Sequence, residues 1–129
     1  APIMEGPTVI KHKGKYYLFY SANHFMSRDY AVGYAVADSP LGPWKKPNDN
    51  RIIHRSTVGE NGSGHGDVFD DSKGNLFYVY HVHHSDHAVS PRLTRIVPLH
   101  FVPSADGFDR VEVKREEVIV PIVKTGGKK

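Results

Sequence analysis

The sequence contains no cysteine, which excludes a disulfide framework, cysteine-ligated zinc and thiol chemistry. It also lacks any apolar run near the roughly 18 residues that a membrane-spanning helix needs, so we expect no membrane partner. Neither a phosphate-binding loop nor a Gly-x-Ser-x-Gly elbow occurs. Residues 1–7 (APIMEGP) carry neither a basic nor an apolar segment, so no signal peptide is visible.

The sequence also lacks a strong excess of either charge, because it has 17 lysines and arginines and 14 acidic residues, a net charge of +3. Lys124, Lys128 and Lys129 supply three positive charges near the C-terminus, so the rest of the chain is neutral. There is no basic-aromatic surface either, and we expect no nucleic-acid partner. What the 129 residues do contain is 39% hydrophobic side chains, enough to bury the core of one domain.

The pattern of these side chains predicts strands. Residues 16–20 (YYLFY) and 76–80 (LFYVY) are runs of β-favouring residues, and a turn with a glycine, Gly14 or Gly74, precedes each run. Nine prolines and twelve glycines interrupt the chain too often for long helices. We therefore predict an all-β fold.

The two hairpins look like copies of one unit, since Gly14 corresponds to Gly74 at an offset of 60 (74 − 14 = 60). After each hairpin come a third strand and a turn that leads to an aromatic residue, Trp44 or Phe108. Trp44 in this position is more typical of packing within the unit than of a sugar platform. Four-stranded antiparallel units of this length are typical of β-propeller blades.

We predict about two blades, residues 5–60 and 61–123, followed by a basic, flexible tail at residues 124–129. Propellers usually close with about 4–8 blades, so two blades leave an exposed strand edge and an open core. This prediction indicates either a homo-oligomer or one part of a larger propeller.

Two polar residues precede the first strands of the two units. Glu5 stands before Gly6 and Pro7, which restrict the backbone, and His65 stands among glycines in the segment 62–67 (GSGHGD). The internal repeat places His65 near the position of Glu5, so we expect both side chains to converge on one pocket. A surface glutamate and a flexible glycine-rich loop would leave the same pattern.

Histidines gather near the end of the second hairpin. His81 and His83 share a strand face by alternation and could share a metal ion. Further candidate ligands are His24, His84, His87 and His100. Arg92 opens the next strand and could bind a polar substrate through two hydrogen bonds. An exposed loop arginine with no binding role would fit this position equally well.

Several segments in order along the chain resemble glycoside hydrolase family 43, five-bladed propeller enzymes that act on xylans and arabinans. The similar segments are residues 4–7 (MEGP) with 14–21 (GKYYLFYS), 37–44 (ADSPLGPW), 64–65 (GH) with 76–81 (LFYVYH), and 92–99 (RLTRIVPL). Together they cover nearly the whole chain but only about the C-terminal half of such an enzyme.

The resemblance implies a glycosidase with roles for three residues. Glu5 would be the general acid that protonates the leaving glycosidic oxygen, and Arg92 would contact the sugar in the −1 subsite. His65 would lie at the channel floor, where several family members hold a calcium ion or another cation; no cofactor is required. The implied partner is an oligosaccharide or polysaccharide, and the family favours secretion or the periplasm. Since a general acid must be protonated near neutral pH, we expect surroundings that raise the pKa of Glu5.

The family's inverting mechanism needs more than these residues, because a carboxylate base must activate water about 6.5–9.5 Å from the acid. In the family, that base and a second aspartate that tunes the acid lie upstream of the Glu-Gly-Pro segment, so we expect neither in this chain. The available carboxylates Asp29, Asp67, Asp70 and Asp71 match no family position for the base.

Several readings stay open at this point. Xylosidase, arabinofuranosidase and arabinanase activities all fit the resemblance. The alternatives to an enzyme are a non-catalytic carbohydrate-binding propeller fragment and a histidine-rich metal-binding β domain.

Overall fold

The computed structural model describes residues 4–126, so Lys128 and Lys129 of the predicted basic tail lie outside the described residues. The elements in chain order are β1 (Met4–His12), β2 (Lys15–Ala22), β3 (Ala31–Ala37), β4 (Arg51–Ile53), α1 (Arg55–Val58), β5 (Gly64–Asp70), β6 (Leu76–Val82), β7 (Leu93–Val102), β8 (Arg110–Glu112) and the 3₁₀-helix η1 (Arg115–Glu117). No helix among residues 4–126 is long and apolar enough to cross a membrane.

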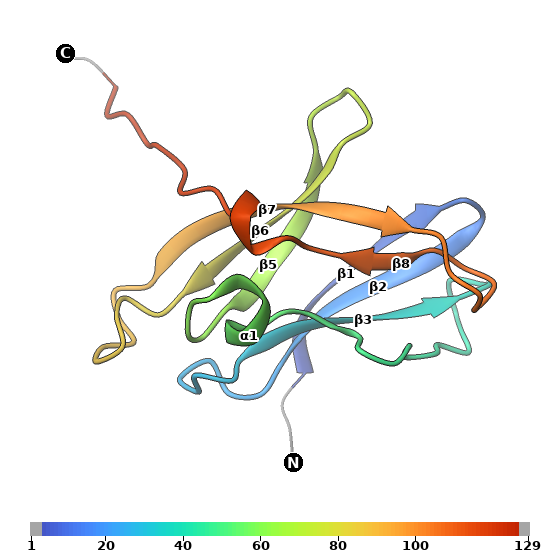
Figure 1. The fold of residues 1–129 in the computed structure, drawn as a ribbon, viewed down its shortest axis with the longest axis horizontal. Helices are drawn as coiled ribbons and strands as arrows, with labels where there is room; N and C mark the ends of the chain where they lie inside the picture. Colours follow the sequence, from blue (N-terminus) through green and yellow to red (C-terminus); the bar gives the residue numbers. More distant parts are fainter. Residues whose placement is uncertain (1–3, 127–129) are drawn as a thin grey trace.

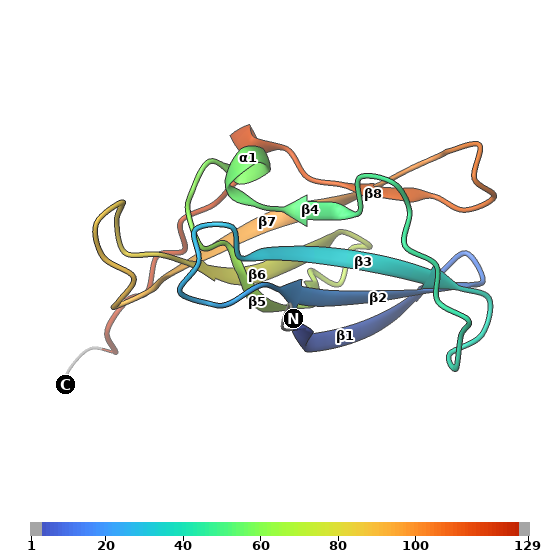
Figure 2. The same ribbon diagram turned by 90° about the horizontal axis from the view of Figure 1, so that it is seen from below.

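The strands form two four-stranded antiparallel sheets with the orders β1-β2-β3-β4 and β5-β6-β7-β8. Each sheet is a meander, in which every strand pairs with the next one in the chain (Figures 1 and 2). The predictions of an all-β fold and of four-stranded antiparallel units are confirmed. The short helix α1 joins the two sheets, and its four residues are too few for a helical period to show in the sequence.

Local sequence explains the two hairpins. Lys13 and Gly14 between β1 and β2 both have positive φ, +49° and +78°, as a two-residue turn that matches the strand twist requires. In the second hairpin Gly74 has a φ of +89°. Strand β2 then places Tyr17 and Phe19 on one face, where both are fully buried.

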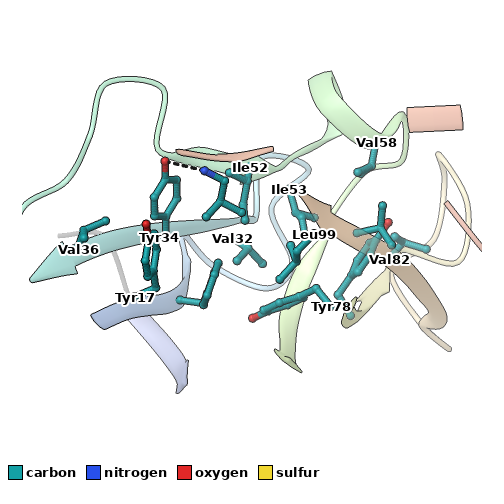
Figure 3. Packing of buried hydrophobic residues seen from close by; sticks show 14 residues of the cluster. Tyr17, Val32, Tyr34, Val36, Ile52, Ile53, Val58, Tyr78, Val82 and Leu99 are labelled. Atoms are coloured by element: carbon teal, nitrogen blue, oxygen red, sulfur yellow. Dashed lines mark hydrogen bonds between the residues drawn. The ribbon is translucent and has the colours of Figure 1, made fainter. Parts of the chain in front are cut away.

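One hydrophobic core spans both sheets (Figure 3). Tyr17, Phe19 and Tyr34 of the first sheet pack in the same cluster as Tyr78 and Leu99 of the second. Burying each such side chain stabilises the fold by about 1.5–3 kcal/mol. This shared core holds the two sheets in a defined relative position.

Hydrogen bonds join the sheets at the end remote from Glu5. The Tyr17 hydroxyl donates to the Asp109 carbonyl oxygen at 2.7 Å, and His12 Nε2 lies 2.8 Å from the Asp109 carboxylate. The Tyr34 hydroxyl accepts a bond from the Val111 N–H at 3.2 Å, drawn as the dashed line in Figure 3. These contacts leave the opposite ends of β1 and β5 to form the candidate site.

Candidate active site

Glu5 is the second residue of β1 and pairs with Ser21 of β2. The strand register shifts between Glu5 and Thr8, and Gly6 takes a φ of +59°, so β1 bulges directly after the glutamate. A bulge of this kind redirects a side chain at the end of a strand. The Glu5 carboxylate Oε2 accepts a hydrogen bond from the Tyr30 hydroxyl at 2.5 Å.

Tyr30 lies just before β3 and is fully buried. A Cβ atom at Gly64 would lie 2.6 Å from the Tyr30 ring, so the glycine leaves the space that the ring occupies. Gly64 is the first residue of β5 and therefore of the second sheet. It leaves room for Tyr30, which binds Glu5 of the first sheet. The two sheets thus build this part of the site together.

His65 comes directly after Gly64 and reaches the same hydroxyl group. Its Nδ1 lies 3.2 Å from the Tyr30 hydroxyl and 3.6 Å from Glu5 Oε2. Its backbone N–H donates to Ser21 Oγ at 2.7 Å. The starts of β1 and β5 are neighbours (Figure 1), and the structure brings Glu5 and His65 together there at the Tyr30 hydroxyl.

His81 and Arg92 extend the group away from Glu5. The His81 ring lies parallel to the rings of Tyr30 and His65, with centroid distances of 5.9 and 6.0 Å. Arg92 Nη1 lies 3.3 Å from His81 Nε2, and its guanidinium lies 5.0 Å from the ring centroid of Phe25. Arg92 is thus connected to Glu5 through His81 and His65.

The surroundings of Glu5 lower its pKa. The hydrogen bond from Tyr30 has the largest effect, partial burial opposes it, and His65 adds to the lowering. This differs from the expectation for a general acid, since the hydrogen bond from Tyr30 and the nearby His65 stabilise the ionised form of the carboxylate. Burial, Arg92 and His65 together lower the pKa of His81 to about 4, so His81 is neutral at physiological pH.

The histidine-rich segment does not form a metal-binding cluster in the described part of the chain. Residues 4–126 contain no group of three or more histidine or acidic side chains arranged to hold an ion. His83 Nε2 lies 2.9 Å from the Phe25 carbonyl, and His84 Nδ1 lies 3.0 Å from that of Pro91. His83 and His84 thus fasten loops, and the calcium expectation for His65 stays a prediction.

Three of the four candidate aspartates have other partners, and Asp67 accepts the Val68 N–H at 2.8 Å. Asp29 lies within 3.1 Å of His54 Nε2 and 2.9 Å of Arg55 Nε, and Asp71 accepts the N–H of Lys73 in the β5–β6 turn. The hydrogen bonds from Arg55 and His54 lower the pKa of Asp29, and those from the Asn75 side chain and the Lys73 N–H lower the pKa of Asp71. The geometry of residues 4–126 thus points to neither Asp29 nor Asp71 as the base.

Sequence reasoning missed Tyr30 and Phe25. The register offers a signal for Tyr30, because Met4 pairs with Ala22, Ala22 pairs with Ala31, and residue 30 therefore lies at the same sheet end as Glu5. Phe25 gives no such signal, since it lies in a loop between two strands.

A well-defined cleft lies elsewhere in the structure. It has a volume of about 480 Å³ and is lined by Trp44, Phe108, Lys15 and Asp38, at the end of the sheets remote from Glu5. Beside the buried Tyr30, the side chains of Glu5 and His65 are partly exposed, at 35% and 51%.

Comparison with solved structures identifies the architecture as part of a glycoside hydrolase propeller. An endo-1,4-beta-xylanase from Bacteroides thetaiotaomicron matches 92% of this chain with a TM-score of 0.79 and 36% identity, and the match covers 40% of that chain. A thermostable family-43 glycoside hydrolase matches 88% of this chain with a TM-score of 0.75 and 44% identity, over 36% of its own length. The two sheets are therefore propeller blades.

Sequence comparison then gives the family. Residues 1–108 match the glycosyl hydrolases family 43, and the chain belongs to this family. The beta-D-galactofuranosidase xynD of Aspergillus niger is 32% identical over 99 residues, which are 76% of this chain and 29% of that protein. The chain thus spans less than half the length of these relatives.

Proposed function

We propose that this chain supplies the general-acid side of an inverting glycosidase site that cleaves xylose- or arabinose-containing oligosaccharides or polysaccharides. Glu5 protonates the leaving oxygen, and His65 and Arg92 contact the sugar. The observation that carries this proposal is the convergence of Glu5 and His65 on one buried hydroxyl, that of Tyr30, at the start of both blades. Family membership supports the substrate class.

The electrostatics set a condition for this role. A general acid works when its pKa lies near the operating pH, whereas Tyr30 and His65 lower the pKa of Glu5. A second carboxylate beside Glu5 would raise that pKa through the repulsion of like charges. The proposed acid therefore needs such a carboxylate, as well as the base, from outside residues 4–126. A second copy of the chain or another part of a propeller would provide them.

The decisive experiment compares the purified chain with its Glu5→Gln variant on aryl glycosides. The sugars are β-xylopyranoside and α-arabinofuranoside, with β-galactofuranoside added because of the related galactofuranosidase. Glutamine preserves the size of the side chain and an acceptor for Tyr30, so the fold is retained. We expect kcat to fall about 10²–10⁴-fold, and more for a phenyl than for a nitrophenyl leaving group, which needs less protonation.

Glu112→Gln is the matched control, since Glu112 is an exposed residue of β8. Equal activity of Glu5→Gln and Glu112→Gln would refute the acid role. Light scattering on the same samples gives the mass, and a monomer that turns over substrate would exclude a second copy as the source of the base.

A non-catalytic carbohydrate-binding role is the second candidate, and the lowered pKa of Glu5 favours it. An ionised Glu5 would accept hydrogen bonds from sugar hydroxyls, and Arg92 would donate them. This reading predicts that xylo- or arabino-oligosaccharides bind without turnover, with weaker binding to Glu5→Gln. Titration calorimetry measures it, and the absence of both turnover and binding would contradict both candidates.

A further inference from the structure

Arg92 differs from three other arginines of the chain in the way it is held. Arg55, Arg95 and Arg110 each pair with a carboxylate. Arg92 has no carboxylate partner among residues 4–126, and its neighbours are a histidine and an aromatic ring. A carboxylate would occupy up to two of its N–H donors and cancel its charge.

The histidine acts as an acceptor in this contact. Arginine can only donate hydrogen bonds, so the His81 Nε2 that faces Arg92 Nη1 at 3.3 Å must be unprotonated. A neutral imidazole then carries its proton on Nδ1, and this atom is buried without a hydrogen-bond partner in residues 4–126. An unsatisfied buried donor costs stability, so this arrangement favours a role for His81 other than holding the fold together.

His81 is itself oriented by its neighbours. Its ring lies nearly parallel to those of Tyr30 and His65, at interplanar angles of 12° and 15°. Tyr30 is fully buried and fixed by its bond to Glu5. The acceptor atom that faces Arg92 is therefore positioned by the same residues that hold the carboxylate.

Phe25 holds the guanidinium from another direction. The Arg92 Cζ lies 5.0 Å from the ring centroid, within the range of a cation–π interaction. The Phe25 carbonyl accepts a bond from the buried His83, which fastens the loop before β3, and His24 stacks on the ring. A neutral acceptor and an aromatic face thus orient Arg92 while engaging one of its five N–H donors.

We propose that His81 and Phe25 are positioning residues that fix the Arg92 guanidinium against His81, the ring that stacks on His65, and leave its other N–H groups free to bind sugar hydroxyls. The assignment of sugar hydroxyls rests on the proposed function. That His81 and Phe25 hold the Arg92 side chain in place can be tested without any enzymatic turnover.

The test is nuclear magnetic resonance of the Arg92 side chain in the complete chain labelled with ¹⁵N-arginine. The Nε–Hε order parameter of Arg92 reports its mobility. In His81→Phe, which preserves a ring between Tyr30 and His65 but removes the acceptor, we expect this value to fall below about 0.6, the range of flexible groups. His81→Gln retains an acceptor and should restore part of the order, and Phe25→Leu should lower it independently.

His87→Phe is the control, because His87 is an exposed residue of the 83–91 loop. Unchanged order of Arg92 in both His81→Phe and Phe25→Leu would overturn the proposal. So would equal mobility in His81→Phe and His81→Gln, since the acceptor would then have no effect. If His81→Phe fails to fold, Phe25→Leu and His81→Gln decide. Absence of hydrolysis would contradict only the proposed function, because Arg92 is ordered or mobile whatever the activity.

Discussion

The two blades share their strand order and hairpins but use the start of the innermost strand differently. Both inner strands bulge at the same point of the repeat, between Glu5 and Thr8 in β1 and between Gly64 and Asp67 in β5. In the first blade the positive φ falls on Gly6, directly after the functional side chain. In the second blade it falls on His65 itself, at +52°.

The difference shows how the same kind of bulge can place a glutamate in one blade and a histidine in the other. A glycine takes the left-handed conformation without strain, so Glu5 has ordinary extended backbone. A histidine in that conformation stores strain, which is typical of functional positions. Gly66, the residue after His65, is needed for another reason: a Cβ atom there would lie 1.6 Å from the Val79 carbonyl oxygen.

The largest expected effect distinguishes the glycine of the first bulge, Gly6, from that of the second, Gly66. Gly66→Ala should destabilise the protein by more than about 3 kcal/mol, because the new methyl group meets backbone that cannot move away. Gly6→Ala should cost only about 1–2 kcal/mol, the strain of positive φ, since its Cβ atom would find the His65 ring at 3.6 Å. Urea unfolding measures both, and similar losses would show that the bulges are equivalent after all.

A smaller effect concerns the hydroxyl that joins the blades. Tyr30→Phe removes the bond to Glu5 and should cost about 1 kcal/mol. The pKa of Glu5 should rise, because that bond is the main cause of its lowering. The ¹³C shift of the Glu5 carboxyl against pH measures this change. Tyr34→Phe, which loses its bond to Val111, is the control and should leave the pKa of Glu5 unchanged.

The same variant has a signature in the pH dependence of stability. The folded pKa of Glu5 lies below its unfolded value, so Glu5 contributes stability above the unfolded pKa and loses it as pH falls through the folded pKa. Tyr30→Phe should reduce this acid-side loss. An undiminished loss would mean that His65, rather than Tyr30, holds the carboxylate.

The smallest effect tests the strain at His65. His65→Gly should change stability by no more than about 1 kcal/mol, in the stabilising direction, because glycine accepts the φ of +52°. Thermal unfolding measures it, and Gly6→Ala should move Tm the opposite way. A clear loss of stability in His65→Gly would show that the contacts of the imidazole outweigh the backbone strain.

Much of the fold could be predicted from local patterns. Alternation and the turn glycines placed the runs at 16–20 and 76–80, which lie within β2 and β6. The repeat indicated that Glu5 and His65 would come together, and they share one hydroxyl. The family resemblance is confirmed as well. The catalytic and binding roles of Glu5, His65 and Arg92 stay predictions.

The sequence by itself determined where the strands run, because β propensity, alternation and glycine turns act over a few neighbouring residues. Only the tertiary structure decided what surrounds each functional group. Tyr30 reaches Glu5 across 25 residues and His65 across 35, and these contacts reverse the expected direction of the Glu5 pKa shift. His83, a candidate metal ligand in the sequence, fastens the loop of Phe25 across 58 residues. Electrostatic and hydrogen-bonding surroundings depend on side chains that meet only when two sheets pack, and no local pattern encodes them.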